Sequence, residues 1–369
     1  MKFRVNRQEL SEACGVVSRA VSQKSALPAL EGILVKAFDN SLKLTGYDLE
    51  IGIETEIPAQ VEKKGEFIIT SRMFCDIVRK LSGDTVDMEV DEKFLTTIKC
   101  GFAEYKVLGM SGEEFPEFPV IKDFHELTLS QPKLKSMIEQ TLFAVSQNDS
   151  KPIHTGSLFE VKDDGFFNIV SLDGFRLALR HEKALNNGGC RFVVPGKALG
   201  EISKILKDED SDVILQVTKR NLAVCVGNYK IYTRLLEGDF LDYEGAIPKN
   251  PNVKIKVNVR SFIDSCERTS LLISDRLKSP LRVKFRKNEI NLSCSTALGK
   301  ATDSFPVEFL EGEELEMGFN NRYLLDALKN TDSDEVILQI SGSLSPMKVL
   351  PTEGDSFLFL VLPVRLKAE

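Results

Sequence analysis

The chain has 369 residues, enough for two or three domains, and its 42% hydrophobic and 28% charged residues are typical of a globular protein. The net charge of −7 argues against nucleic acid wrapped around the whole outer surface, and no run of about 18 apolar residues predicts a membrane span. The first ten residues lack the apolar core and cleavage site of a signal peptide, so we expect a cytoplasmic protein.

Several common site motifs are absent from the sequence. There is no His-Glu-x-x-His, no phosphate-binding Gly-x-x-x-x-Gly-Lys-Ser/Thr and no Gly-x-Gly-x-x-Gly. The seven cysteines are odd in number and scattered without a Cys-x-x-Cys pair, which argues against a disulfide framework and a zinc site. We therefore expect no metal and no cofactor, and we expect the cysteines to be small buried apolar residues.

The first third of the chain predicts two amphipathic helices, each placed after a strand. The segment 7–24 puts Leu10, Ala13, Val17 and Val21 on one face at helical spacing. A second helix is predicted at 72–81 after the apolar run 67–70, with Ser71 as its N-cap. Its apolar stripe consists of Phe74, Ile77, Val78 and Leu81.

The same order of strand and helix recurs through the rest of the chain. Helices are predicted at 132–151, 195–207, 260–278 and 321–330, and Pro132 suits a first helical turn. Between the helices the sequence alternates apolar and polar residues, which predicts half-buried strands at 212–218 and 334–340. Hairpin turns are expected at 39–40 and 287–288.

The six helix-bearing segments group into three pairs separated by proline-rich joins at 116–119 and 248–251. This repetition predicts an α+β fold of three domains, each with two helices and antiparallel sheets, at 1–124, 125–249 and 250–369. Because a repeat can be purely architectural, the repetition alone predicts geometry and leaves function open.

Positive charge collects on the six predicted helices. They hold 18 Lys and Arg against 10 Asp and Glu, an excess of +8, while the remaining residues carry −15. Phosphates attract Lys and Arg regardless of base sequence, so the pattern favours helices that face a polyanion. The alternative is the Lys-rich solvent face of any amphipathic helix, and only the consistency across six helices favours the first interpretation.

A ring is consistent with this arrangement. Two copies of the chain would supply twelve helices, which at about 9 Å spacing give a circumference of roughly 110 Å and an opening of about 25 Å. A DNA duplex passes through such an opening. Three domains per chain, closed as a head-to-tail dimer, would satisfy this geometry.

Specific motifs along the whole chain resemble the bacterial DNA polymerase III beta subunit family. The segment 171–178, Ser-Leu-Asp-Gly-Phe-Arg-Leu-Ala, is similar to the Thr-Asp-Gly-His-Arg-Leu-Ala stretch of the family. Further segments also match, in the same order as in the family. They are 1–3 at the N-terminus, 27–30, 317–320 together with 323–325, and 360–366 at the end of the chain.

This resemblance implies a non-enzymatic sliding clamp, a homodimeric ring that encircles double-stranded DNA without sequence specificity and acts as a polymerase processivity factor. It also implies a pocket that binds short peptides of the DNA polymerase III alpha subunit, the clamp loader and other proteins with a clamp-binding motif. The implied pocket residues are Gly174, Phe175, Arg176 and Leu177 on one side, Asn320, Tyr323, Leu360, Val361, Leu362, Pro363, Val364 and Arg365 on the other, and Thr155 and Leu241 close to family pocket positions.

The sequence departs from the family pattern in three places. Phe175 stands where histidine is common, Leu241 replaces a proline, and Glu244-Gly-Ala246 occupies a place where a basic residue is frequent. Because these changes lie in the implied pocket, we expect them to alter its peptide preference.

The resemblance also implies DNA-facing and interface residues. Lys24 matches a basic family position near DNA, and charge and helix position add Arg72, Arg79, Lys80, Lys197, Lys204 and Lys207. The ring joint would pair the first and third domains through Tyr105 and Val107 on an edge strand and Leu272 and Ile273 on a helix.

Two other functions are weighed against the clamp. An enzyme could use Asp173 beside Arg176, or Asp242 near Glu244, as catalytic carboxylates, although no base, metal or nucleophile accompanies them. A repeat scaffold that binds only proteins is the third interpretation, and the helix charge count weakly disfavours it.

Overall fold

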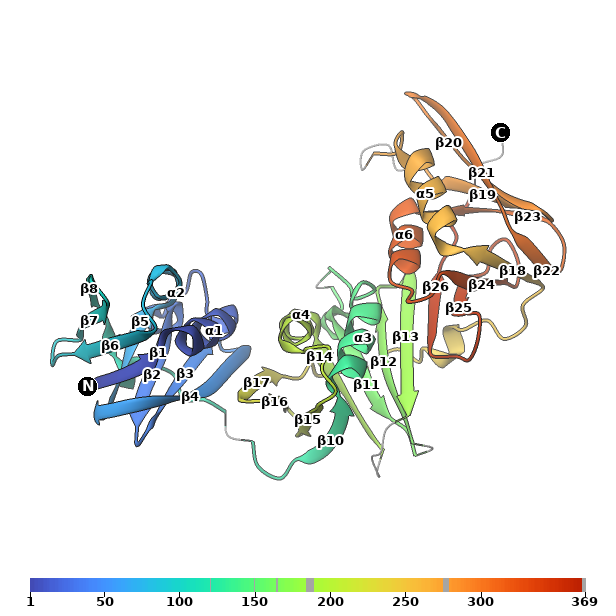
Figure 1. Cartoon of the computed structure of the whole chain (residues 1–369). Coiled ribbons are helices and arrows are strands. Elements are labelled where there is room, and N and C mark those ends of the chain that lie inside the picture. Colours follow the sequence, from blue (N-terminus) through green and yellow to red (C-terminus); the bar gives the residue numbers. More distant parts are fainter. Residues whose placement is uncertain (120, 149, 164, 184–188, 275–278, 367–369) are drawn as a thin grey trace. The chain divides into compact units, whose positions relative to one another are not determined.

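The computed structural model describes residues 1–119, 121–148, 150–163, 165–183, 189–274 and 279–366 (Figure 1). These residues form two compact units. The first consists of residues 1–132 and 201–235, and the second of residues 133–200 and 236–369. Each unit is built around antiparallel sheets with helices packed on them.

All six predicted helices are present in the described part of the chain. They are α1 Arg7–Val17, α2 Ser71–Lys80, α3 Gln131–Leu142, α4 Gly196–Ile205, α5 Val259–Ser270 and α6 Asn321–Lys329. The lengths predicted for the first, third and fifth helices were wrong. After α1, for example, the Ser18 hydroxyl donates to the Gly15 carbonyl at 3.0 Å and the chain tightens into the 3₁₀ turn Ser18–Ala20.

The first unit contains one large sheet of 13 strands. Its main path runs β10-β15-β16-β17-β4-β1-β6-β7-β8, so β8 lies at one edge and, among the described residues, pairs with β7 alone. The other four strands branch from this path. The strands are β1 Lys2–Asn6, β2 Gly32–Phe38, β3 Ser41–Tyr47, β4 Ile51–Lys63, β5 Gly65–Thr70, β6 Thr85–Val90, β7 Leu95–Cys100, β8 Ala103–Leu108, β9 Met110–Ser111, β10 His125–Ser130, β15 Asp212–Val217, β16 Asn221–Val226 and β17 Tyr229–Arg234.

Helices α1 and α2 pack against each other and against this sheet through their predicted apolar faces. Leu10, Ala13 and Val17 of α1 are buried, as are Phe74 and Val78 of α2. Asn6 caps α1, because its side-chain oxygen accepts from the backbone N–H groups of residues 8 and 9. The helical spacing in the sequence therefore predicted the buried face of both helices.

The second unit contains a sheet of nine strands and a sheet of four. The larger sheet runs β14-β11-β12-β13-β26-β25-β24-β18-β22, and the smaller runs β21-β20-β19-β23. The strands are β11 Gly156–Val161, β12 Phe166–Leu172, β13 Arg176–Lys183, β14 Cys190–Pro195, β18 Val253–Asn258, β19 Leu281–Phe285, β20 Glu289–Thr296, β21 Gly299–Pro306, β22 Glu308–Glu311, β23 Leu315–Phe319, β24 Glu335–Ile340, β25 Met347–Pro351 and β26 Phe357–Val361.

The strands predicted from alternation and the turns predicted at residues 39–40 and 287–288 are confirmed. The segments 212–218 and 334–340 correspond to β15 and β24, and the two-residue turn 39–40 joins β2 to β3. Asp39 in that turn has φ of 47°, a left-handed conformation that aspartate tolerates better than most residues. Residues 287–288 lie in the turn between β19 and β20.

Each large sheet is continuous across a predicted domain boundary. In the first unit β4 pairs with β17, with Tyr229 opposite Thr55 and Thr233 opposite Ile51. In the second unit β13 pairs with β26. The boundaries at 124/125 and 249/250 stay predictions, because the sheets cross them without interruption.

Candidate functional site

Four of the predicted pocket segments surround one apolar cluster in the second unit. The cluster is built on Leu172 and Leu177, which flank the turn at Gly174, and on Leu360 of β26. Tyr243 and Phe240 bring the segment around Leu241 to it, and Ile153 brings the turn that ends at Thr155. Segments far apart in the sequence thus meet at one place on the surface.

Strand pairing holds the turn at Gly174 against the C-terminal segment. In the β13–β26 pair, Arg176 lies opposite Val361 and Leu177 opposite Leu360. Beyond the strand, the Leu362 N–H donates to the Phe175 carbonyl at 2.9 Å, and the Val364 N–H donates to the Gly318 carbonyl at 2.8 Å. These backbone hydrogen bonds fix residues 362–364 between the turn and strand β23.

The turn itself follows from its sequence. Gly174 has φ of 88°, a conformation that strongly favours glycine. One carboxylate oxygen of Asp173 accepts from the backbone N–H groups of Phe175 at 2.9 Å and Arg176 at 3.1 Å. The Asp-Gly pair therefore determines the direction in which the next two side chains leave the sheet.

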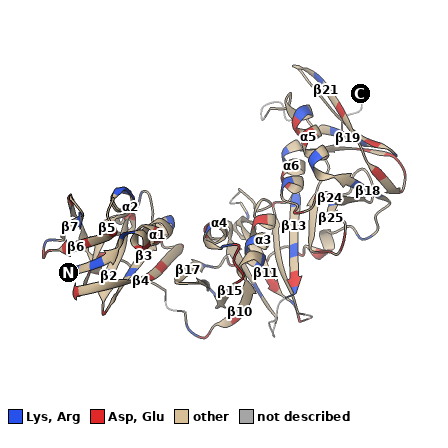
Figure 2. Cartoon of the chain, in the orientation of Figure 1, with Lys and Arg blue, Asp and Glu red and all other residues tan. Residues whose placement is uncertain are grey.

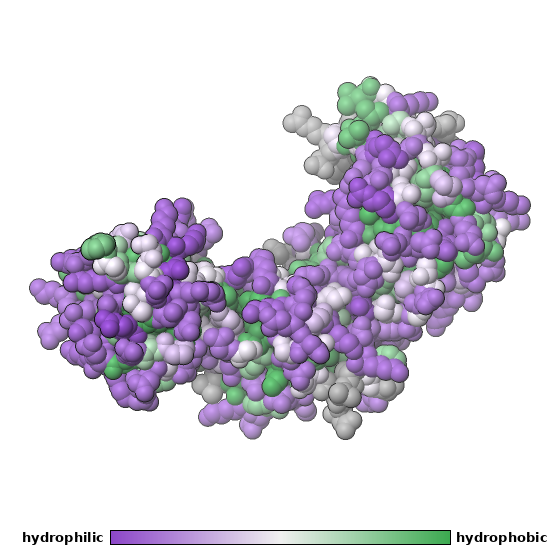
Figure 3. Space-filling model, in the orientation of Figure 1, coloured by the Kyte–Doolittle hydropathy of each residue, from purple (hydrophilic) through white to green (hydrophobic). Residues whose placement is uncertain are grey.

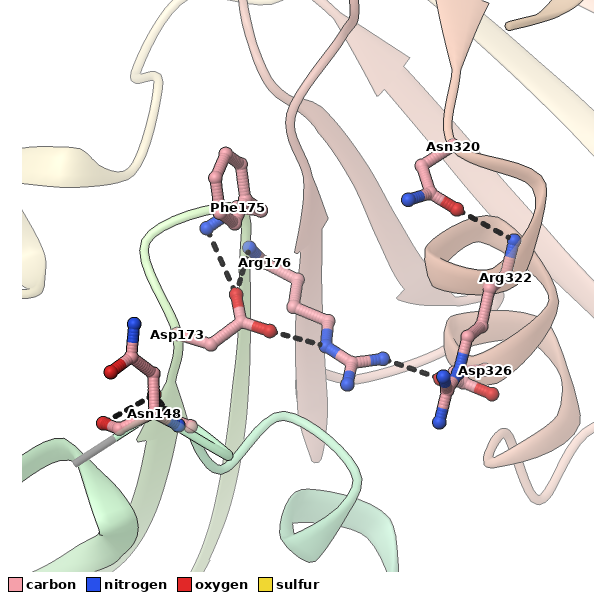
Figure 4. A network of polar contacts seen from close by, with 8 residues as sticks. Asn148, Asp173, Phe175, Arg176, Asn320, Arg322 and Asp326 are labelled. Carbon is pink, nitrogen blue, oxygen red and sulfur yellow. Dashed lines mark hydrogen bonds and ion pairs between the residues drawn. The ribbon is translucent and has the colours of Figure 1, made fainter. Parts of the chain in front are cut away.

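Arg176 is the buried centre of the site, with 7% of its surface exposed. Its Nε donates to Asp173 at 2.9 Å and its Nη1 donates to Asp326 of α6 at 2.5 Å, so it joins the turn to the helix (Figure 4). The guanidinium carbon also lies 4.6 Å from the ring centroid of Tyr323. Two carboxylates and an aromatic face satisfy this buried cation.

Three of the predicted pocket residues reach solvent through apolar side chains. Phe175 is 58% exposed, and its ring stacks on Tyr323 with centroids 5.9 Å apart. Leu241 is 49% exposed and Val364 is 43% exposed. Exposed apolar side chains beside a rigid turn are suited to bind apolar anchors of a peptide.

Other predicted pocket residues have a supporting position instead. Leu177, Leu360 and Val361 are buried, so their prediction as lining residues needs correction: they pack beneath the surface. Thr155 donates its hydroxyl to the Pro152 carbonyl at 2.7 Å and so stabilises its own turn. Asn320 caps α6 by accepting from the Arg322 N–H. Leu362 and Pro363 are half-buried, and Arg365 is exposed.

A pocket of about 720 Å³ adjoins this surface along α6. Asn320, Tyr323 and Val364 of the predicted set line it, together with Asp326 and Arg322. Asp326 was not among the predicted pocket residues. The available signal was its helical spacing, because Asp326 follows Tyr323 by three residues and so lies on the same side of α6.

Tyr243 anchors the segment that carries Leu241, and sequence reasoning also missed its role. Its hydroxyl donates to the Glu160 carboxylate at 2.6 Å and accepts from the Asn168 amide at 3.2 Å. Burial, reinforced by the Glu160 carboxylate, raises the pKa of Tyr243 above its ordinary value. The phenol therefore stays protonated and keeps donating at physiological pH.

Two of the carboxylates considered for catalysis, Asp173 and Glu244, have structural partners. Asp173 accepts hydrogen bonds from Arg176 and from the backbone of the turn, and Glu244 pairs with Lys162 at 2.7 Å.

In the part of the chain that the structure describes, no cluster of His, Cys, Asp or Glu could hold a metal ion. No helix there is long and apolar enough to cross a membrane.

The charge excess on the helices is smaller than predicted. Within their observed bounds the six helices hold 12 Lys and Arg against eight Asp and Glu, and α1 and α5 carry no positive excess (Figure 2). The reason is that Arg19, Lys24, Lys151 and Lys207 lie outside the six α-helices, while Arg276 and Lys278 lie outside the described residues. Helix α2 has the strongest excess, with Arg72, Arg79 and Lys80 against Asp76.

All seven predicted DNA-facing residues are exposed in this chain. Arg79 lies 3.5 Å from Asp76, Lys204 lies 2.7 Å from Glu201, and Lys207 lies 3.7 Å from Glu209. Exposed pairs of this kind contribute about 0–1 kcal/mol, so they leave the cations available to phosphate.

The predicted interface residues are only partly at the surface. Tyr105 is exposed on the edge strand β8, but Val107 is buried, and Leu108 and Phe102 are the exposed apolar residues at that edge. At the end of α5, Leu272 and Ile273 are half-buried whereas Leu271 is 83% exposed. Hydrophobic residues also gather at the end of the β20–β21 hairpin, where Leu298 is exposed (Figure 3).

Family comparison covers nearly the whole chain. Models of the DNA polymerase III beta subunit match in order: the N-terminal domain at residues 1–119, the central domain at 128–242 and the C-terminal domain at 244–365. The beta sliding clamp of Bacillus subtilis is 33% identical over 377 residues, which cover 99% of this chain and 100% of that protein.

Solved structures agree with the sequence comparison. The DNA polymerase sliding clamp from Bacillus subtilis gives a TM-score of 0.96 at 32% identity and covers 100% of both chains. The beta subunit from Bartonella birtlesii, solved bound to griselimycin, gives 0.93 at 28% identity and covers 99% of this chain and 100% of that one. The predicted α+β fold of three clamp domains is thereby confirmed.

Replacing Arg176 with Met should destabilise the second unit, because Asp173 and Asp326 lose their shared cation. We expect a loss of about 3 kcal/mol in the free energy of unfolding, seen as a lower urea midpoint by circular dichroism. Arg286 is an exposed control that lies 3.5 Å from Glu289, and Arg286→Met should change stability by less than about 0.5 kcal/mol. Equal midpoints for both variants would contradict a structural role for the Arg176 network.

Proposed function

The chain belongs to the DNA polymerase III beta subunit family, and we propose on that premise that it is a sliding clamp: a homodimeric ring around double-stranded DNA that tethers the replicative polymerase. It is a non-catalytic processivity factor. It acts by encircling the DNA and by binding partner proteins. We place it in the cytoplasm, where replication of a bacterial chromosome takes place.

The single observation that carries this proposal is the match of all three family domains in order over nearly the full chain. The described residues are compatible with it, because Asp173, Asp326 and Glu244 near the predicted pocket serve structural contacts. Non-specific binding is supported by exposed Lys and Arg on and after the helices, which attract phosphates of any sequence.

For partner proteins we propose the surface around Phe175, Leu241 and Val364 as the peptide-binding site. Its occupants are apolar side chains of clamp-binding segments in the DNA polymerase III alpha subunit, the clamp loader and other DNA-processing proteins. The Arg176 network and the β13–β26 pair support this surface from beneath, so little ordering is needed when a peptide binds.

For the ring joint we propose that β8 of one protomer meets the end of α5 and the edge strand β21 of its partner. Both β8 and β21 lie at sheet edges and present unpaired backbone groups. Leu108 and Phe102 on one side and Leu271 and Leu298 on the other are exposed apolar residues that such a joint would cover. A head-to-tail contact of this kind closes into a ring when two copies suffice.

The proposed function is tested by comparing how long the protein stays on circular and on linear DNA. The chain should scatter light with twice its mass of 41.2 kDa, and after loading by a clamp loader it should remain on nicked circular DNA. Linearising the circle should release it, because free ends let a ring slide off. A monomer, or a protein retained equally on linear and circular DNA, would exclude the clamp mechanism.

The peptide site is tested by Leu241→Asp. A carboxylate placed beside an apolar anchor must be desolvated, so a fluorescent peptide from the polymerase alpha subunit should bind at least about tenfold more weakly by anisotropy. Leu310 is 48% exposed on β22 and provides a matched control, because Leu310→Asp introduces the same charge away from the predicted pocket. Equal affinity of the two variants would place peptide binding elsewhere.

The ring joint is tested by Leu271→Asp. Burying this charge between protomers should convert dimers to monomers in sedimentation at micromolar concentration, while circular dichroism stays unchanged. Leu344 is similarly exposed, so Leu344→Asp should leave the dimer intact. A dimer that persists in Leu271→Asp would show that the end of α5 lies outside the interface.

A further inference from the structure

A short acidic segment, residues 237–244, borders the proposed peptide-binding surface on one side. It contains four carboxylates and no Lys or Arg. Leu236, Phe240 and Tyr243 pack into the apolar cluster beneath the surface, so they hold the segment in place. Its remaining residues are exposed, and with Leu241 they include all four carboxylates: Glu237, Asp239, Asp242 and Glu244.

The carboxylates closest to the buried centre of the site are neutralised, whereas those of the acidic segment face solvent. Asp173 and Asp326 both accept hydrogen bonds from Arg176. In the acidic segment, Glu244 pairs with Lys162 at 2.7 Å, and 62% of the Glu244 side chain is exposed. Because exposed pairs of this kind contribute little, Glu244 can exchange Lys162 for a cation of a ligand.

The pocket along α6, on the other side of the surface, has the reverse charge. Among the described residues that line it, Arg322 and Lys329 are cations and Asp326 is a carboxylate. Asp326 is bonded to Arg176, and Lys329 pairs with Glu267 at 2.5 Å. The pocket therefore offers little attraction to a basic side chain.

Phe175 lies between the acidic segment and this pocket. Its ring stacks on Tyr323, which lines the pocket, and the nearby Leu177 packs in the same cluster as Tyr243 of the acidic segment. A peptide that covers Phe175 and extends to Leu241 would thus have the acidic segment at one end and the cations of α6 at the other.

We propose that the acidic segment selects clamp-binding peptides that carry Lys or Arg beside their apolar anchors, at the end that lies over Leu241. This inference rests on the peptide-binding site of the proposed function and adds the charge of its ligand. Charge at the rim of an interface chiefly changes the association rate and the choice among partners. The segment therefore favours basic clamp-binding peptides over neutral or acidic ones with the same apolar anchors.

The test uses the full-length protein and three fluorescent peptides that share the apolar core of the polymerase alpha subunit segment. One carries a Lys-Lys pair at its N-terminus, one carries it at its C-terminus, and the third has Gln in both places. Only one of the Lys placements should lower the Kd relative to the Gln peptide, by about fivefold in about 50 mM salt. In about 500 mM salt the gain should fall below about twofold, because exposed charges are screened.

A charge-reversed variant locates the effect. In Asp242→Lys/Glu244→Lys, the ratio of the Kd values for the Gln and Lys peptides should fall to about one. The matched control is Glu308→Lys/Glu311→Lys on β22, where exposed carboxylates also pair with lysines, four strands from β26 in the sheet. This control makes the same change in net charge and should retain the gain.

The possible failures are distinguishable. Equal gains from both Lys placements would reflect attraction to the net charge of −7 of the whole chain and would overturn the inference, as would a gain that survives in Asp242→Lys/Glu244→Lys. Binding of the Gln peptide with no gain from either placement would overturn it while leaving the peptide-binding site intact. If none of the three peptides binds, the peptide-binding site itself is wrong and the inference is overturned with it.

Discussion

The pairing of β13 with β26 is the constraint on which the candidate site depends. It brings the turn at Gly174 beside the C-terminal segment, although about 180 residues separate them, and it places Arg176 where Asp326 of α6 can reach it. Register matters here, because a slip by one residue would exchange Leu360 and Val361 between the two faces of the strand. Leu360 packs into the cluster beneath the pocket and Val361 into the larger core on the other side.

Local features of the fold were predictable from the sequence because they depend on neighbouring residues. Helical spacing predicted the buried faces of α1 and α2, alternation predicted β15 and β24, and the 39–40 pair predicted a turn. Helix ends were less predictable, since at Ser18 a side-chain hydrogen bond and a 3₁₀ turn replace the next helical turn. The same error inflated the estimate of positive charge on the helices.

The site was predictable only in part. The family motifs identified the turn at Gly174 and the C-terminal segment, but motif matching does not distinguish a residue at the surface from one beneath it. Leu177 and Leu360 are buried while Phe175 and Leu241 are exposed, and that division depends on pairing partners distant in sequence. Asp326 and Glu160 act through contacts across 150 and 83 residues, which no local pattern reveals.

The continuity of each large sheet across the repeats has a consequence for how the chain is made. Part of β4 has β17 as its neighbour, and β17 ends at Arg234, so residues 51–55 leave the ribosome long before their partner exists. At about 5–20 residues per second the delay is on the order of 10 s. During that interval an apolar strand edge is open to chaperones or to neighbouring nascent chains. Each large sheet takes its strands from two repeats, so it is complete only after both have been synthesised. A single repeat expressed alone would therefore contain an incomplete sheet.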